Sequence, residues 1–289
     1  MMTAALPYIT GSVVSRDGTT IAYRQVGHGP GVVLVHGGIQ ASQNFMRLAE
    51  ALADAFTVYV PDRRGRGLSG PHGAGYCLRK ECEDIDALLA KTGAGNIFGL
   101  SSGAIISLQA ALTLPSVRRA AIYEPPLSVD GSSPTEWIAR FDREIAQGRL
   151  PSALVTVIKG VQAGPVTDAM PRAVLTPLLR LALLADERNV GAGDIPLRQL
   201  IPTMHFDLQL VKETESQLDR YAAIPANVLL LGGSKSQKFL RQTLDALNVV
   251  VAQAKRVEFA GLDHMGPDNR GKPGIVAAEL RRFFSSAEA

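Results

Sequence analysis

The chain is poor in the residue types that build disulfide frameworks and metal centres. Among 289 residues there are two cysteines and five histidines. Cys77 and Cys82 lie five positions apart, in or beside one expected helix, where they point in different directions, so we expect no structural disulfide. No histidine and cysteine pair has the spacing of metal ligands. We therefore expect neither a metal nor a cofactor.

Long apolar runs and charge of a single sign are also missing. No stretch approaches the length of a membrane span, and residues 1–16 lack a basic segment followed by an apolar core, so we expect no secretory signal and a cytoplasmic location. The net charge is +3, and the cations alternate with acids. This pattern argues against nucleic acid or membrane as a partner and favours a small-molecule substrate. A homodimer stays open.

One basic cluster stands out from this background. Arg63, Arg64 and Arg66 fall in a glycine-bearing loop. They either anchor the loop through hydrogen bonds while their side chains are solvated, or neutralise an anionic substrate.

Apolar segments and helical periods alternate along most of the chain, which has 46% hydrophobic residues. The pattern predicts strands at 13–14, 20–26, 31–35, 56–60, 96–100, 119–123, 228–231 and 256–259, and helices at 43–55, 78–92, 102–114, 237–250 and 275–284. Parallel strands need helical crossovers, so we predict an α/β fold with a mostly parallel sheet flanked by helices.

The alternation stops in the middle of the chain. Residues 126–224 show only helical periods interrupted by prolines. An insertion of this length predicts a helical cap over the carboxyl edge of the sheet. We therefore divide the chain into a core of residues 1–125 and 225–289 and a cap, or lid, of residues 126–224.

A glycine-flanked serine follows one of the apolar strands. Gly99-Leu100-Ser101-Ser102-Gly103 fits a sharp turn from strand to helix, in which small residues avoid collisions with neighbouring backbone. Such a nucleophile elbow exposes the hydroxyl of Ser101 for covalent catalysis. The backbone N–H of Ser102 would lie at a helix N-terminus, without an intrahelical acceptor, and could stabilise a substrate oxyanion.

Four segments together resemble the α/β-hydrolase family in the family's order. They are Val33-Leu34-Val35-His36-Gly37-Gly38, the loop Asp62-Arg63-Arg64-Gly65-Arg66-Gly67-Leu68-Ser69, the elbow at Gly99 to Gly103, and Gly261-Leu262-Asp263-His264. The resemblance covers essentially the whole chain and implies a serine-nucleophile, capped esterase-like or lactonase-like member.

The resemblance also assigns roles to individual residues. His264 stands where the family keeps its catalytic histidine, and a histidine can both take and return a proton near neutral pH. The second oxyanion donor would be the backbone N–H of Gly38 or Ile39. His36 lies inside the same turn, and we expect it to brace that loop. His28 and His72 look like exposed loop residues.

The third member of a Ser-His-acid triad departs from the family's usual pattern. The family usually places an aspartate after the strand at 228–231, where Lys235 and its neighbours offer no carboxylate. Some members carry the acid one strand earlier, and Glu124 occupies that place. A Ser-His dyad without an acid remains open. Three further carboxylates remain alternatives as the acid: Asp263, Asp268 and Asp245.

These residues predict a cofactor-free serine hydrolase that cleaves an ester, lactone or thioester through an acyl-enzyme on Ser101. Apolar residues at helical spacing in the cap favour a small to medium, largely apolar substrate. One alternative is a carbon–carbon hydrolase or lyase that uses the same Ser-His site. Another is a non-catalytic ligand-binding protein, suggested by Lys235 in place of the usual acid. Epoxide hydrolase and dehalogenase chemistry is set aside, because those family members carry an aspartate at the position of Ser101.

Overall fold

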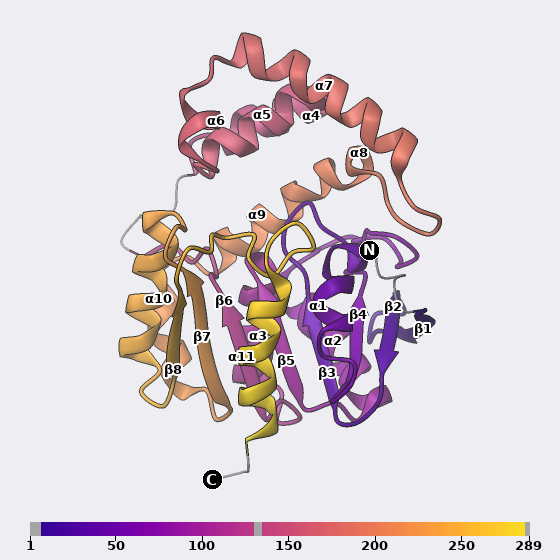
Figure 1. The fold of residues 1–289 in the computed structure, drawn as a ribbon, viewed down its shortest axis with the longest axis vertical. Coiled ribbons are helices and arrows are strands. Elements are labelled where there is room, and N and C mark those ends of the chain that lie inside the picture. The colour runs from indigo at the N-terminus through magenta and orange to yellow at the C-terminus, as the bar shows by residue number, and fades with distance from the viewer. Residues whose placement is uncertain (1–6, 130–134, 287–289) are drawn as a thin grey trace.

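The central element of the protein is one eight-stranded sheet, seen in a computed structural model that describes residues 7–129 and 135–286 (Figure 1). The strand order is β1-β2-β4-β3-β5-β6-β7-β8. β1 and β2 pair antiparallel with each other, β2 pairs antiparallel with β4, and all other pairs are parallel. The strands are β1 Ile9–Val14, β2 Thr20–Gly27, β3 Gly31–Val35, β4 Thr57–Pro61, β5 Asn96–Leu100, β6 Arg119–Tyr123, β7 Asn227–Gly233 and β8 Lys255–Phe259. The prediction of a mostly parallel sheet is confirmed.

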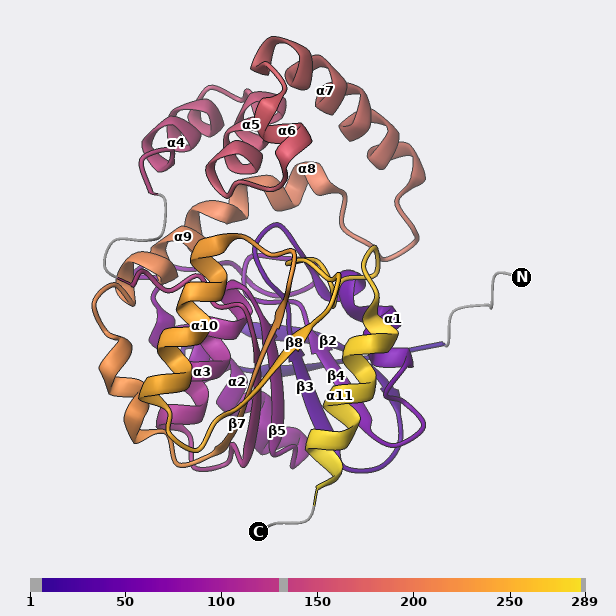
Figure 2. The ribbon, with the colours of Figure 1, turned by 60° about the vertical axis from the view of Figure 1, so that its left-hand side comes forward.

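Helices cover both faces of this sheet, and each face has its own apolar core. α1 (Met46–Glu50) and α11 (Pro273–Ser285) pack on one face. α2 (Leu78–Thr92), α3 (Ser102–Thr113), α10 (Lys238–Val250) and the 3-10 helix η3 (Leu218–Ala223) pack on the other. Figure 2 shows the two groups on opposite sides of the strands. The central strands β5 and β6 are buried along their whole length, as expected for parallel strands covered on both faces.

The segment between β6 and β7 is helical and lies beyond the carboxyl ends of the parallel strands (Figure 1). It contains α4 Ile138–Ala146, α5 Leu150–Gly160, α6 Pro165–Ala169, α7 Arg172–Asn189, α8 Leu197–Leu200, η2 Ile201–Thr203 and α9 Met204–Glu213. α4, α5 and α7 share a small apolar cluster to which η2 and α9 add Ile201 and Leu208. α9 differs from the other cap helices, because Leu210 and Val211 belong to the main core beneath it. The cap is therefore joined to the sheet most firmly through α9.

One expected helix is shorter than its apolar pattern suggests. Residues 43–55 form a 3-10 turn, η1 (Ser42–Phe45), followed by the five residues of α1. Arg281, from α11, donates a hydrogen bond to the carbonyl of Ala51 at 2.6 Å, and this occupies an acceptor that a longer helix would use itself. The apolar spacing still predicts burial, since Leu48 and Leu52 are both fully buried.

Candidate active site

Ser101 lies in the sharp turn between β5 and α3. Its backbone has φ 57° and ψ −123°, a conformation that costs energy for any residue with a side chain. The turn also brings backbone segments very close together, because a Cβ on Gly103 would collide with the carbonyl oxygens of Val35 and His36. The N–H of Ser101 donates to the carbonyl of Tyr123 on β6 at 2.9 Å. Neighbouring strands therefore hold the strained serine at the carboxyl edge of the sheet.

Glu124 and His264 meet at this same edge. Glu124 directly follows β6, is fully buried and has φ 47°. Its Oε2 lies 2.7 Å from Nδ1 of His264, and its Oε1 accepts a hydrogen bond from the N–H of Gly233 at 2.6 Å. The hydroxyl of Tyr123 donates to the carbonyl of Asp263 at 2.8 Å and so supports the loop that carries His264. Both carboxylate oxygens of Glu124 thus have partners that fix the direction of the carboxylate.

The other candidate acids point elsewhere. Asp263 is exposed, and its carboxylate accepts from the N–H of Met265. Asp245 is exposed and forms an ion pair with Arg256. Asp268 is buried but accepts hydrogen bonds from Gln40 and Asn44 instead. Within residues 7–129 and 135–286, Glu124 is the carboxylate that hydrogen-bonds His264.

The loop after β3 approaches the serine from the other side. A Cβ on Gly37 would lie 3.0 Å from Cβ of Ser101, and Ile39 has a positive φ of 55°. The N–H of Gly37 donates to Oε1 of Gln40 at 2.8 Å, which fixes the start of the loop. Ser102 is the first residue of α3, where backbone N–H groups have no intrahelical acceptor. The predicted donors Gly38, Ile39 and Ser102 are therefore found in two segments that converge beside Ser101.

His36 braces this loop, in the role that its sequence position indicated. The ring is fully buried, its Nδ1 lies 3.0 Å from the carbonyl oxygen of Gly37, and its Nε2 accepts from the N–H of Arg63 at 3.3 Å. Burial lowers the pKa of His36 well below the usual value, and the positive charges of Arg66 and Arg63 lower it further. A neutral ring with one donor and one acceptor fits both contacts.

The arginines of the loop after β4 are buried and ion-paired. Arg63 donates to Glu81 at 2.7 Å and to Asp207 at 2.6 Å, and Arg66 donates to the second oxygen of Asp207 at 2.6 Å. These guanidinium groups anchor the loop, as one half of the prediction held. The expectation of solvated side chains is wrong, because Arg63 and Arg66 are each 2% exposed.

Arg64 is held in the same manner by different partners. It donates to Asp84 at 2.6 Å and to Asp17 at 3.0 Å. All three guanidinium groups are directed at carboxylates of the protein, which supports the anchoring role over the neutralisation of an anionic substrate.

Asp207 is the site residue that sequence reasoning missed. It lies on α9, and its Oδ1 accepts a hydrogen bond from the hydroxyl of Ser102 at 2.8 Å. A signal existed in the sequence, since Asp207 shares a helix face with Met204 and Val211 and interrupts an apolar stripe. Buried carboxylates on such a stripe need charged or hydrogen-bonding partners, and here the loop after β4 and the elbow supply them.

The remaining histidines have surface or packing roles. His72 was expected to be exposed, which is wrong: its ring stacks on Phe206 with centroids 3.5 Å apart and an interplanar angle of 9°. Burial, together with nearby Arg66, lowers the pKa of His72 to about 4. His205 is exposed and contacts Asp142 at 2.9 Å. Among the described residues, no cluster of three or more His, Cys, Asp or Glu side chains could hold a metal ion.

A cavity of about 520 Å³ lies between the cap and the carboxyl edge of the sheet. Ser101 and His264 line its floor together with Gly38 and Ile39. Its roof comes from the cap and is mainly apolar. Residues that form it include Trp137, Leu154, Val157, Leu183 and Leu208. The predicted nucleophile, base and oxyanion loop therefore open onto one space that suits an apolar ligand of moderate size.

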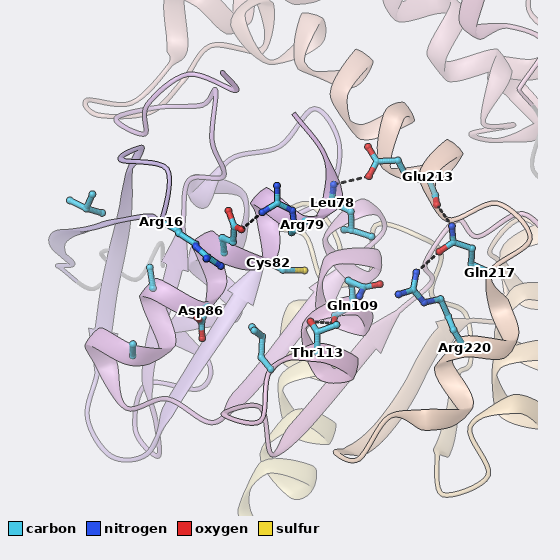
Figure 3. A pocket seen from close by; sticks show the side chains of 15 residues that line it. Arg16, Leu78, Arg79, Cys82, Asp86, Gln109, Thr113, Glu213, Gln217 and Arg220 are labelled. Atoms are coloured by element: carbon cyan, nitrogen blue, oxygen red, sulfur yellow. Dashed lines mark hydrogen bonds and ion pairs between the residues drawn. The ribbon is translucent and has the colours of Figure 1, made fainter. Parts of the chain in front are cut away.

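A second and larger hollow, of about 990 Å³, lies on the flank of the core (Figure 3). Its walls come from α2, α3 and the segment after α9, and carry polar contacts such as the Arg79–Glu83 ion pair and the hydrogen bond from Leu78 N–H to Glu213. Neither Ser101 nor His264 lines it. The larger of these two cavities is therefore not the one that contains the predicted catalytic residues.

Comparison with known proteins agrees with the fold. Residues 32–278 match the alpha/beta hydrolase family. An uncharacterised hydrolase of Bacillus subtilis, YraK, is 26% identical over 264 residues, which cover 89% of this chain and 90% of YraK. A crystal structure of an alpha/beta hydrolase from Sphaerobacter thermophilus is 29% identical, has a TM-score of 0.75, and covers 95% of this chain and 100% of that one. A pimeloyl-[acyl-carrier protein] methyl ester esterase of Xanthomonas campestris is 34% identical over 121 residues, 42% of this chain and 46% of the esterase.

The protein belongs to the alpha/beta hydrolase family, because the match spans most of the chain, from β3 to α11. The family and the hydrolase relatives together support hydrolase activity. No helix among residues 7–129 and 135–286 combines the length and apolar character needed to cross a bilayer.

Proposed function

We propose that the protein is a cofactor-free serine hydrolase that cleaves an ester, lactone or thioester through an acyl-enzyme on Ser101. The observation that carries the proposal is the 2.7 Å contact between His264 Nδ1 and the buried carboxylate of Glu124, in a cavity that Ser101 also lines. A serine hydroxyl needs a base to attack an acyl carbon at neutral pH. A histidine oriented by a carboxylate is the arrangement that supplies one.

The proposed reaction assigns one step to each group. The contact with Glu124 keeps a proton on Nδ1 of His264, so that Nε2 is free to take the hydroxyl proton of Ser101. The serine oxygen then bonds to the acyl carbon, and the leaving alkoxide or thiolate departs with the proton that His264 returns. Water, deprotonated by the same histidine, attacks the acyl-enzyme and releases the acid and Ser101.

The oxyanion of each tetrahedral intermediate would be bound by backbone donors. We assign the N–H of Ser102, at the N-terminus of α3, and the N–H of Gly38 or Ile39 from the loop after β3. The tight packing around these residues supports the assignment, since preorganised donors avoid reorganisation during the reaction. Gly37 lies against Ser101 and is itself fixed by Gln40.

The cavity supports a small to medium, largely apolar acyl group. Its volume of about 520 Å³ and its leucine- and valine-rich roof would remove such a group from water while the carbonyl faces Ser101. The name of the Xanthomonas relative describes a methyl ester esterase, which is consistent with an ester as the scissile bond. The exact substrate is set by the cap residues.

Fluorophosphonate labelling followed by intact-protein mass spectrometry tests the proposal. Wild type should gain one label, Ser101→Ala should gain none, and Glu124→Gln should label much more slowly. Asp263→Asn is the matched control, because Asp263 is next to His264 in sequence, yet its exposed carboxylate accepts from the N–H of Met265. A wild-type protein that stays unlabelled and turns over no simple ester contradicts the proposal.

Two other functions use the same pocket. A carbon–carbon hydrolase or lyase would show Ser101-dependent turnover of such substrates in preference to esters. A non-catalytic ligand-binding protein was suggested by the missing acid after β7, whereas Glu124 beside His264 supports the hydrolase proposal.

A further inference from the structure

The cap helix α9 contacts the residue that carries one of the proposed oxyanion donors. The hydroxyl of Ser102 donates to Oδ1 of Asp207 at 2.8 Å. Arg63 donates to the same hydroxyl at 3.1 Å and to the same carboxylate oxygen at 2.6 Å. The side chain of Ser102 therefore lies in a closed triangle of hydrogen bonds with Arg63 and Asp207.

α9 also borders the other half of the proposed oxyanion hole. A Cβ on Gly38 would lie 2.9 Å from the sulfur of Met204 and 3.3 Å from Oδ2 of Asp207. A single turn of α9 thus touches both the elbow and the loop after β3. Any movement of this turn changes the space between the two segments that carry the donors.

The position of Asp207 is over-determined. Both carboxylate oxygens accept from guanidinium groups, Arg63 on one side and Arg66 on the other, each at 2.6 Å. The side chain is 2% exposed. Burial alone would raise the pKa of Asp207, but the positive charges of Arg66 and Arg63 hold it far below the usual range. The carboxylate is therefore charged and immobile at neutral pH.

We propose that Asp207 is a positioning residue for the oxyanion hole, which acts through the hydroxyl of Ser102 and carries the placement of the cap into the catalytic turn. This inference rests on the proposed function, because it concerns the orientation of a donor used in that reaction. A purely structural network would affect stability. A positioning contact lowers kcat while the ground-state binding of substrate is unchanged, since the oxyanion exists only during the reaction.

Ser102→Ala tests the inference with little risk to folding. The substitution removes the hydroxyl but keeps the backbone N–H of residue 102 and both ion pairs of Asp207. Ser107→Ala is the matched control. Ser107 is also buried on α3, and its hydroxyl donates to the carbonyl oxygen of Gly103, in the same helix, at 2.9 Å. The measurements are kcat and KM on a p-nitrophenyl ester, the rate of fluorophosphonate labelling, and Tm.

We expect kcat and the labelling rate of Ser102→Ala to fall about tenfold, less than the loss from removing a donor outright, with KM within about twofold. Ser107→Ala should keep wild-type kcat at a similar Tm. In a double-mutant cycle, Asp207→Ala should add little further loss of kcat to Ser102→Ala, because both changes remove the hydrogen bond between Ser102 and Asp207.

Three results would overturn the inference. In the first, Ser102→Ala and Ser107→Ala have equal kcat. In the second, both variants lose kcat in parallel with a loss of Tm. Either result leaves the proposed hydrolase function intact. If wild type neither labels nor turns over esters, the proposed function fails, and the positioning role fails with it. Should Asp207→Ala not fold, because Arg63 and Arg66 lose their shared carboxylate, the comparison of Ser102→Ala with Ser107→Ala alone still decides.

Discussion

Gln40 donates a hydrogen bond from Nε2 to Oδ2 of Asp268 at 2.8 Å, and both side chains are buried. The other end of the same amide accepts from the N–H of Gly37 at 2.8 Å. These contacts connect the loop that follows His264 to the loop after β3, which contains Gly37 and Gly38. Asp268 was one of the candidate acids for His264, and the structure gives it this different set of partners.

Replacing Gln40 by methionine should impair catalysis and stability together. The N–H of Gly37 would be left without this partner, which costs roughly 1–3 kcal/mol of the free energy of unfolding, whereas Oδ2 of Asp268 would keep Asn44 as a donor. The loop would also lose a support close to Ser101, so we expect kcat to fall about tenfold. Urea denaturation and ester kinetics measure the two effects.

The control is Gln253→Met, in which the lost contact is a hydrogen bond to the carbonyl of Ile224, just before β7 and β8 begin, whereas Gln40 follows the carboxyl end of β3. It should lower stability and leave kcat unchanged. Equal kcat in wild type and Gln40→Met would show that the contact is not needed to hold the loop.

Glu124→Gln should lower kcat strongly and affect stability little. Glutamine keeps an oxygen that can accept from Gly233, but its amide cannot stabilise the positive His264 that forms during the reaction. We expect a loss of roughly 10²–10⁴ in kcat, the range set by tautomer and charge control in Ser-His-acid sites. Steady-state kinetics beside Asp263→Asn measure it. Retention of more than a third of wild-type kcat would favour a Ser-His dyad.

Gly103→Ala should prevent the elbow from forming. The new methyl group would meet the carbonyl oxygens of Val35 and His36, which are backbone atoms of β3 and its loop and cannot move aside. We expect a loss of at least ~3 kcal/mol in the free energy of unfolding, at the upper end for overpacking. Gly274→Ala is the control, because nothing lies within 4 Å of its added Cβ. Chemical denaturation, or the yield of folded protein, distinguishes them.

His72 should make the protein less stable in mild acid. Its pKa is lowered to about 4 in the folded protein, against an ordinary value of about 6.5. Between these values the unfolded chain binds the extra proton, so the contribution is fully present above pH ~6.5 and is lost as the pH falls toward 4. His72→Phe keeps a ring against Phe206 and cannot titrate.

The measurement is the free energy of unfolding in urea at pH 7 and pH 5. Wild type should lose more stability between the two than His72→Phe does, while His28→Gln, at an exposed position, should behave as wild type. Identical pH dependence of all three proteins would show that His72 titrates normally.

Local sequence patterns predicted the parts of the fold that depend on local chemistry. The helix expected at residues 78–92 has those bounds in the structure, since an apolar face and a terminal Gly93 in the left-handed conformation specify it locally. Glu124 could be named because the end of a parallel strand, followed by two prolines, determines where a side chain lies relative to the sheet edge. The contact itself joins residues 140 positions apart.

The contacts that were missed involve residues from separate elements. Ser102 and Asp207 are 105 positions apart, and nothing in either segment specifies the other. From sequence alone Arg63 resembles a surface arginine, but in the structure it pairs with Glu81 and Asp207, which belong to two different helices. His72 appeared exposed because its loop neighbours are glycine and proline, whereas Phe206 of the cap covers its ring. Such pairings depend on how the cap packs against the core, and no local sequence pattern specifies that packing.

The attachment of α9 divides the cap into two parts. The helices before α9 could be exchanged, in evolution or by engineering, whereas α9 itself has to be retained. Helices between residues 138 and 200 pack on one another and line the substrate cavity, so a foreign set could replace them and change substrate preference. α9 is different, because Asp207 accepts a hydrogen bond from Ser102 and Met204 lies against Gly38. A chimaera whose foreign helices end just before α9 would keep the contacts of Met204 and Asp207 with the segments that carry the proposed oxyanion donors, whereas one whose foreign helices include α9 would lose them.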